Sequence, residues 1–324
     1  MKLKLQTNNT EALKTALSLI SSLRKYILLR FTPEILYVIS VNGQSITQEP
    51  QVWCKLQMRS IFNQIEIQSL RDNTISLEIS VELFLQTLRN FDKANSESLS
   101  IRLQRKESSG AQSTNSTNSR TASLALYYSN VNIHSNAINH TFRIPVKILK
   151  NTQDLLLLKE PELHDIDLIM KLPSEFVSTY KRLDKFKKSS NNDTILIKAS
   201  RRRGGFLGFV MEEEGKYRVT ISWNEKLEVL KPVHNNLDDA RGEILQPITE
   251  VDKDNIDEDD DSEDKEIIVR LRDWQSASKI VATCKTVILL LTAKECVLHC
   301  LLQDSDEVEI IYYISGIRIR SSID

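Results

Sequence analysis

The sequence predicts an α+β fold made of two similar domains, each with two helices packed on antiparallel sheets. The chain has 324 residues, which is about the length of two average domains. Segments with the alternating pattern of strands outnumber helical segments, and most connections are too short for parallel crossovers. The same order of elements occurs in both halves, although no residue-level similarity joins them.

In the N-terminal half, alternation predicts the strands and the spacing of apolar residues predicts two helices. Thr10 is the expected N-cap of the first helix, and Phe84, Leu88 and Phe91 share one side of the second. The expected helices cover residues 10–24 and 81–93, and the expected strands cover residues 2–6, 27–31, 35–41, 52–58, 65–70, 74–79, 99–104, 123–128 and 140–149.

The C-terminal half repeats this order. Its first helix follows Pro173 and its second begins at Trp274. The expected helices cover residues 174–188 and 274–285, and the expected strands cover residues 165–171, 194–200, 206–212, 217–223, 267–271, 287–291, 297–302 and 309–314.

The predicted domains are residues 1–149 and 164–324, joined by a connector at 150–163. Residues 107–121 are rich in Ser, Thr and Asn and predict a flexible excursion between strands. Residues 234–265 are polar, then acidic, and predict a disordered insert. Residues 250–266 carry a net charge of −9 within a chain of net charge −1, so the remainder carries +8. A basic folded part is compatible with nucleic-acid binding.

Several protein classes are disfavoured by the sequence. The first residues lack a secretory signal, and no apolar run approaches the roughly 20 residues that span a bilayer, so we expect a soluble intracellular protein. The four cysteines, Cys54, Cys284, Cys296 and Cys300, are too scattered for a disulfide framework and are interpreted as reduced thiols. Although Cys296 and Cys300 flank His299, no second ligand pair completes a metal site.

Enzyme signatures are also missing. The sequence contains no phosphate-binding glycine loop, no His-Glu-x-x-His and no Gly-x-Ser-x-Gly. The acidic run has no expected fold to fix its carboxylates for acid–base work or for a nuclease metal site. We therefore expect no catalytic activity, no metal and no cofactor.

The strongest functional pattern is a basic face repeated on the helices. Lys181, Lys185 and Lys188 are spaced i, i+4, i+7 and therefore share one face, with Arg182 beside them. A solvated helix face usually mixes Lys with Glu, whereas outward acids are few here. Plain surface lysines remain the alternative. The corresponding candidates on the other helices are Lys14 and Lys25, Arg89 and Lys93, and Arg272, Gln275 and Lys279.

The order of elements and several local strings resemble sliding clamps such as proliferating cell nuclear antigen, and more closely the nine-one-one checkpoint clamp subunits of the Hus-one/Mec-three type. The resemblance covers nearly the whole chain, although no single string is specific. No long C-terminal extension is present, which disfavours the Rad-nine type. The strings are 1–5 (MKLKL), 22–25 (SLRK), 29–31 (LRF), 142–147 (FRIPVK), 172–176 (LPSEF), 182–185 (RLDK), 194–200 (TILIKAS), 273–279 (DWQSASK), 297–300 (VLHC) and 311–314 (IYYI).

This resemblance implies a nuclear protein that forms part of a pseudo-sixfold ring, with helices lining the hole and contacting duplex DNA near single/double-strand junctions. The implied partners are a Rad-nine type subunit, a Rad-one type subunit and an ATP-dependent clamp loader. No contact with a membrane is implied. A homotrimeric replication clamp and a protein-only β-rich adaptor remain alternatives. Subunits would join by pairing residues 140–149 with 217–223, which makes the expected interface residues Phe142, Ile144, Val146, Tyr217, Val219 and Ile221.

Overall fold

The chain forms two compact units in a computed structural model. The first unit contains Met1–Gly43, Val52–Glu160 and Glu307–Glu309, and the second contains Gln44–Gln51, Pro161–Asp306 and Ile310–Asp324. The structure describes residues 1–41, 49–105, 122–131, 137–150, 154, 157–163, 165–187, 193–201, 205–213, 215–224, 227–232, 245–247, 264–303 and 307–317. The expected excursion at 107–121 therefore lies outside the described residues, as does nearly all of the acidic segment.

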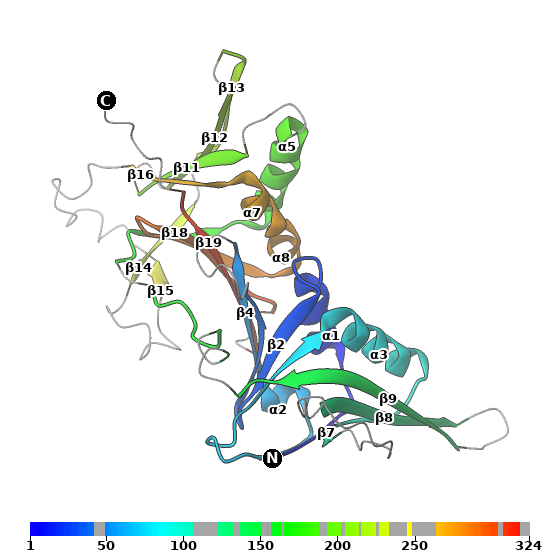
Figure 1. Ribbon diagram of the computed structural model, residues 1–324. Helices are drawn as coiled ribbons and strands as arrows, with labels where there is room; N and C mark the ends of the chain where they lie inside the picture. The colour runs from blue at the N-terminus through cyan, green and yellow to red at the C-terminus, as the bar shows by residue number, and fades with distance from the viewer. Residues whose placement is uncertain are drawn as a thin grey trace, which may run out of the picture. The chain divides into compact units, whose positions relative to one another are not determined.

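In the first unit, helices α1 and α3 lie side by side against the strands (Figure 1). Its strand order is β4-β3-β2-β6-β9-β8-β7-β1-β5, and every pairing described within it is antiparallel. Its elements are β1 (Lys2–Thr7), α1 (Glu11–Ile20), β2 (Tyr26–Phe31), β3 (Ile35–Ser40), β4 (Gln51–Gln57), α2 (Met58–Ile61), β5 (Gln64–Gln68), β6 (Ile75–Ser80), α3 (Val81–Lys93), β7 (Leu99–Arg105), β8 (Ala122–Val131) and β9 (Ala137–Ile148).

The second unit has a four-stranded sheet, β13-β12-β11-β16, and a second sheet with the order β15-β14-β10-β17-β18-β19. Its elements are β10 (Leu168–Leu172), a 3₁₀ turn η1 (Ser174–Phe176), α5 (Val177–Lys187), β11 (Thr194–Ser200), β12 (Phe206–Glu213), β13 (Tyr217–Asn224), β14 (Glu228–Pro232), β15 (Leu245–Pro247), β16 (Lys265–Arg270), α7 (Leu271–Ser276), α8 (Ser278–Thr283), β17 (Thr286–Leu291), β18 (Glu295–Leu301) and β19 (Val308–Ser315).

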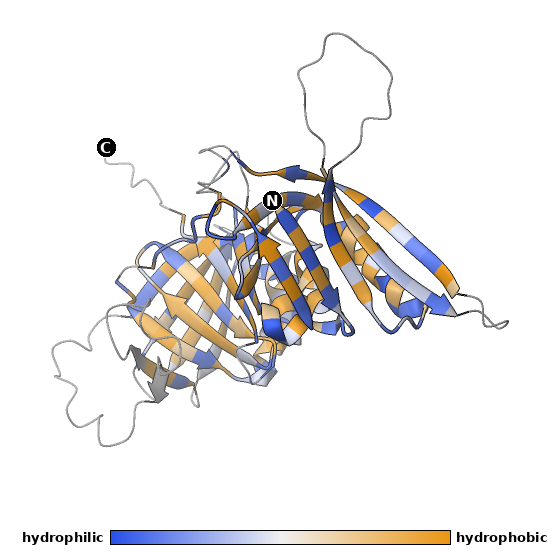
Figure 2. Ribbon diagram, turned by 90° about the horizontal axis from the view of Figure 1, so that it is seen from below, coloured by the Kyte–Doolittle hydropathy of each residue, from blue (hydrophilic) through white to orange (hydrophobic). Residues whose placement is uncertain are grey.

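Alternation along the strands decides which face of each sheet is buried. Hydrophobic and hydrophilic residues alternate along many strands in Figure 2. In β1, for example, Leu3 and Leu5 are buried while Lys2 is exposed. Each unit therefore has an apolar layer between its sheets and helices.

The core of the second unit is organised around aromatic rings. Trp274 of α7 is fully buried and stacks on Tyr180 of α5, with ring centroids 5.4 Å apart. Phe209 of β12 lies 5.2 Å from the same indole, and Phe176 lies 6.4 Å from it. This cluster fixes the inner side of α5 and so determines which of its residues face outward.

The helix boundaries differ from the predictions in three places. The first helix ends at Ile20, and Thr10 makes no capping hydrogen bond because its hydroxyl donates to Asp92 on α3 at 2.9 Å. The helix expected at 174–188 starts with the 3₁₀ turn η1 after Pro173. The helix expected at 274–285 is two short helices, separated at Ala277.

Two expected irregular segments are partly ordered. Within the expected disordered insert, β15 pairs with β14, with Leu245 opposite Pro232. In the connector, Leu158 is buried and its carbonyl accepts a hydrogen bond from Arg30 at 3.5 Å. Lys55 forms an ion pair with Glu160 at 2.9 Å. Leu158 and Glu160 of the connector therefore contact the first unit.

All four cysteines are free thiols, and Cys54, Cys296 and Cys300 are buried. Burial raises the pKa of the Cys296 thiol well above its usual range. None of the helices in the described part of the chain is long and apolar enough to cross a membrane.

Candidate nucleic-acid interface

Helix α5 presents a basic face because its apolar residues fill the opposite side. Tyr180 and Leu183 are buried. Lys181, Arg182 and Lys185 are exposed on the turns between and after them. Lys188, the last residue predicted for this face, lies outside the described residues.

The cations of α5 lack carboxylate partners among the described residues. No ion pair found there includes Lys181, Arg182 or Lys185. Asp184 is the single acid in the helix sequence. This face therefore carries uncompensated positive charge, which suits phosphate groups better than a neutral partner.

The first unit offers a second exposed group of cations. Arg89 and Lys93 lie on the exposed side of α3, and Lys25 is exposed after α1. The Lys25 ammonium lies 5.8 Å from the centroid of the Tyr26 ring, which is itself 54% exposed. These three residues remain candidates for phosphate contact.

Lys14 does not belong to a carboxylate-free face, and this corrects the sequence interpretation. Its ammonium binds Asp92 of α3 and lies 2.9 Å from Glu11 of its own helix. The hydrogen bond to Asp92 is the main reason that the pKa of Lys14 is raised, with Glu11 contributing in the same direction. Lys14 therefore joins α1 to α3, and its charge is already compensated.

Replacing Lys14 by alanine tests this structural role. We expect the free energy of unfolding to fall by about 0.5–1 kcal/mol, because a partly exposed ion pair between helices is lost. DNA affinity should keep its salt dependence, since no phosphate contact is removed. Chemical denaturation and a salt series of DNA binding measure the two effects. Lys93→Ala, at an exposed residue of the proposed DNA contact, is the opposite case and should flatten the salt slope at unchanged stability. A flatter salt slope at unchanged stability would assign Lys14 to the DNA contact.

The cations of α7 and α8 also have interaction partners within the chain, which the sequence interpretation did not include. Arg272 lies 3.8 Å from Asp193 and 3.5 Å from Asp273. Burial raises the pKa of Asp273, and Arg272 opposes that rise. Gln275 is buried in place of pointing outward. Lys279 is exposed but also has an interaction partner within the chain.

Strand β13 forms one edge of the four-stranded sheet. It pairs with β12 along its whole length, from Tyr217 opposite Glu213 to Asn224 opposite Phe206. No other described strand pairs with it. Val219 and Ile221 are half-buried, so the strand offers a backbone edge with partly covered side chains.

Strand β9 is an edge over only part of its length. Its last residues pair with β6, with Val146 opposite Ile79, so the expected edge at 140–149 is closed from Val146 onward. Ile144 is buried in the core, and Phe142 stacks against Tyr128 at 5.9 Å. The side without a described partner runs along the preceding residues, 137–145.

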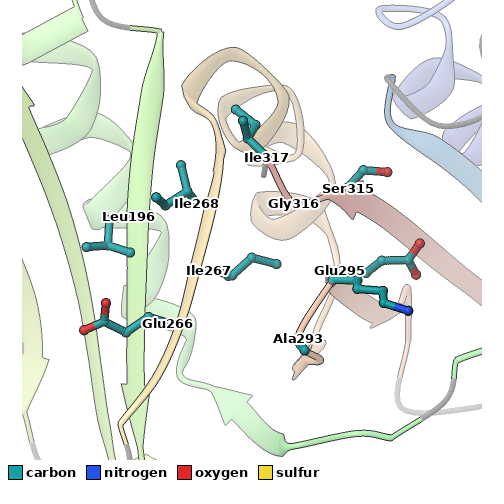
Figure 3. A pocket seen from close by; sticks show the side chains of 10 residues that line it. Leu196, Glu266, Ile267, Ile268, Ala293, Glu295, Ser315, Gly316 and Ile317 are labelled. Carbon is teal, nitrogen blue, oxygen red and sulfur yellow. The ribbon is translucent and has the colours of Figure 1, made fainter. Parts of the chain in front are cut away.

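The carboxylates, histidines and cysteines of the described residues are predicted to form no metal site. No group of three or more His, Cys, Asp or Glu side chains among them could hold a metal ion. A cavity of about 590 Å³ in the second unit contains two carboxylates (Figure 3). Glu266 pairs with Lys198, whereas burial raises the pKa of Glu295. The cavity is lined by Leu196, Glu266, Ile267, Ile268, Ala293, Lys294, Glu295, Ser315, Gly316 and Ile317.

Comparison with known proteins identifies relatives along nearly the whole chain. A family described as Hus1-like protein matches residues 1–318. The DNA damage checkpoint control protein MEC3 of Saccharomyces cerevisiae is 24% identical, with 97% of this chain and 99% of that protein covered. The checkpoint protein hus1 of Schizosaccharomyces pombe is 28% identical over 62% of each chain.

A solved structure supports the fold. Proliferating cellular nuclear antigen from Entamoeba histolytica matches 98% of this chain and 99% of its own, with a TM-score of 0.59 and 12% identity. Similarity at this identity concerns the fold alone. The predicted α+β sliding-clamp fold is confirmed.

Proposed function

Because the chain belongs to the Hus1-like protein family, we propose that it is a subunit of a heterotrimeric DNA sliding clamp. The clamp encircles duplex DNA at damage sites and acts as a platform for checkpoint signalling and repair. The observation that carries the proposal is the family match over residues 1–318, joined to an uncompensated basic face on α5. The chain acts as a platform and catalyses no reaction in this proposal.

The proposed DNA contact is electrostatic. Lys181, Arg182 and Lys185 meet backbone phosphates, together with Lys25, Arg89 and Lys93 of the first unit. Contacts to phosphates position a protein without reading base sequence, so the clamp can move along the duplex. A closed ring retains DNA by topology, and each individual contact can therefore be weak.

The proposed ring closes by strand pairing between subunits. The edge of β13 that pairs with no described strand meets the part of β9 before Val146 in a neighbouring subunit, which supplies hydrogen bonds to both edges. The other two subunits are of the Rad-nine and Rad-one types, an ATP-dependent loader opens the ring, and the complex works in the nucleus at single/double-strand junctions.

Co-expression tests the assembly. The chain alone should form no stable ring, whereas expression with a Rad-nine type and a Rad-one type subunit should give a 1:1:1 complex. Native mass spectrometry distinguishes these states, and the Lys181→Ala, Lys185→Ala variant is the control that should assemble equally well. A stable homotrimer at micromolar concentration would favour a replication clamp. Failure of both assemblies would favour a protein-only adaptor.

A further inference from the structure

The sheet of the first unit carries a second basic surface, on the face opposite its helices. Phe91 of α3 packs against Tyr128 of β8 with ring centroids 5.6 Å apart, which marks the inner face (Figure 1). Neighbouring residues in a strand point to opposite faces, so Tyr127 faces outward. A duplex lying against the helices therefore cannot reach this outer face.

The strand register aligns three cations across the outer face. Lys4 of β1 is opposite Arg102 of β7, which is opposite Ala125 of β8. Ala125 is in turn opposite Arg143 of β9. Neighbouring strands are about 4.8 Å apart, so this row extends over roughly 14 Å. Both arginines are exposed, whereas Ala125 between them is fully buried and so covered by the side chains around it.

Neutral side chains hold the two arginines in place. The Arg102 Nε donates to Ser100 Oγ at 3.3 Å, and the Arg102 guanidinium lies 5.4 Å from the centroid of the Tyr127 ring. Gln104 donates its amide hydrogen to the Tyr127 hydroxyl and accepts a hydrogen bond from Arg143 Nε at 3.4 Å. Each arginine is thus anchored through Nε, which leaves its terminal nitrogens to face a ligand.

The two arginines of this row have no acidic partner among the described residues, whereas Lys4 lies near one carboxylate. Glu66 lies opposite Lys4, but it forms its ion pair with Lys2, and the hydrogen bond from Lys2 lowers the pKa of Glu66. No ion pair is found for Arg102 or Arg143 in the described part of the chain. Oriented guanidinium groups without a carboxylate partner form a site for an anion.

The four-stranded sheet of the second unit provides a contrast. Lys198 of β11 pairs with Glu266 directly opposite on β16. Arg218 of β13 lies opposite Glu212 of β12, at 3.7 Å. Cations on that sheet therefore have acids directly opposite them, whereas no acid lies opposite Arg102 or Arg143 in the described pairings.

We propose that this row is a docking site for a phosphorylated acidic peptide segment of a partner protein. Guanidinium groups bind phosphate and carboxylate oxygens in a two-pronged geometry, and paired arginines are a common means of recognising phosphorylated motifs. Arg102 lies over one face of the Tyr127 ring, so that face is not open to stacking by a nucleobase. The chemistry therefore favours a peptide over single-stranded nucleic acid.

Fluorescence anisotropy with the full chain tests the proposal. The probe is a labelled twelve-residue peptide of Asp, Glu and Gly with one central phosphoserine, beside the same peptide with serine. The variant Arg102→Gln, Arg143→Gln removes the two guanidinium groups, and Lys198→Gln, Arg218→Gln is the matched control. The variant Arg102→Lys, Arg143→Lys keeps the charge without the two-pronged geometry. Melting temperatures establish that each variant is folded.

We expect the double glutamine variant to bind the phosphopeptide at least about tenfold more weakly, because several charge-assisted hydrogen bonds are lost. The control should bind like the wild type, and the lysine variant should fall between them. Equal binding of both peptides by the wild type would overturn the proposal. So would equal losses in both glutamine variants, or a single-stranded oligonucleotide that binds through Arg102 and Arg143 when the peptide does not.

Discussion

Replacement of Lys181, Lys185 and Lys188 by alanine is expected to weaken DNA association roughly a hundredfold at 0.15 M salt. Each phosphate contact adds about 0.9 to the slope of log affinity against log salt, so three contacts account for about 2.7 units. The loss should be equal for unrelated DNA sequences, because phosphates carry no base identity. Lys181 and Lys185, the two of these lysines that the structure describes, should account for about two thirds of the loss in log affinity.

The measurement is DNA association of the assembled clamp across a salt series. A matched control replaces three lysines of the second unit that already have acidic partners. Lys171 pairs with Glu228, Lys198 with Glu266 and Lys216 with Glu213. Both variants lose the same net charge, so a difference between them isolates the α5 face. If the affinity curves of the α5 variant and the wild type superimpose while the ring still assembles, these lysines do not contact DNA and are ordinary solvated surface residues.

Replacement of Trp274 by alanine is expected to lower the free energy of unfolding of the second unit by about 3–5 kcal/mol. The indole is fully buried and contacts Tyr180, Phe209 and Phe176, so its removal leaves a large cavity between α5, α7 and β12. Because Tyr180 rests on this indole, α5 should lose its fixed position together with the core.

Chemical denaturation of the isolated chain measures this loss. The transition of the second unit must be separated from that of the first, because a chain with two compact units need not unfold in one step. Trp223→Ala is the control, since this indole is only half-buried on the edge strand β13. If Trp274→Ala lowers the free energy of unfolding by less than about 1 kcal/mol, the aromatic cluster is not what holds α5 in position.

Periodicity in the sequence predicts the boundaries of an element correctly where one pattern dominates. Helix α3 has its predicted bounds, because Phe84, Leu88 and Phe91 repeat at helical spacing without interruption. The break at Ala277 could not be predicted, since apolar residues continue at helical spacing across it. Strand β15 has only three residues, from Leu245 to Pro247, and a segment of this length is too short to show an alternating pattern.

The candidate site was predictable only in part, because charge compensation depends on residues distant in sequence. The lysines of α5 could be assigned to one face from their spacing alone. The pairing of Lys14 with Asp92 joins residues on two different helices, so inspection of one helix could not reveal it. The row containing Arg102 and Arg143 could not be predicted from the sequence, because it arises from the register of strands β7, β8 and β9, which periodicity within one strand does not determine.

The edge of β13, which no other described strand covers, also affects the amount of this protein in the cell. A free edge strand is a template for pairing with other chains, so newly made copies that outnumber their partners are exposed to aggregation and to quality-control proteases. Copies whose edge is covered escape both. The steady-state level of this chain should therefore follow the supply of whatever covers β13, so that depleting that partner lowers its half-life without any change in its messenger RNA.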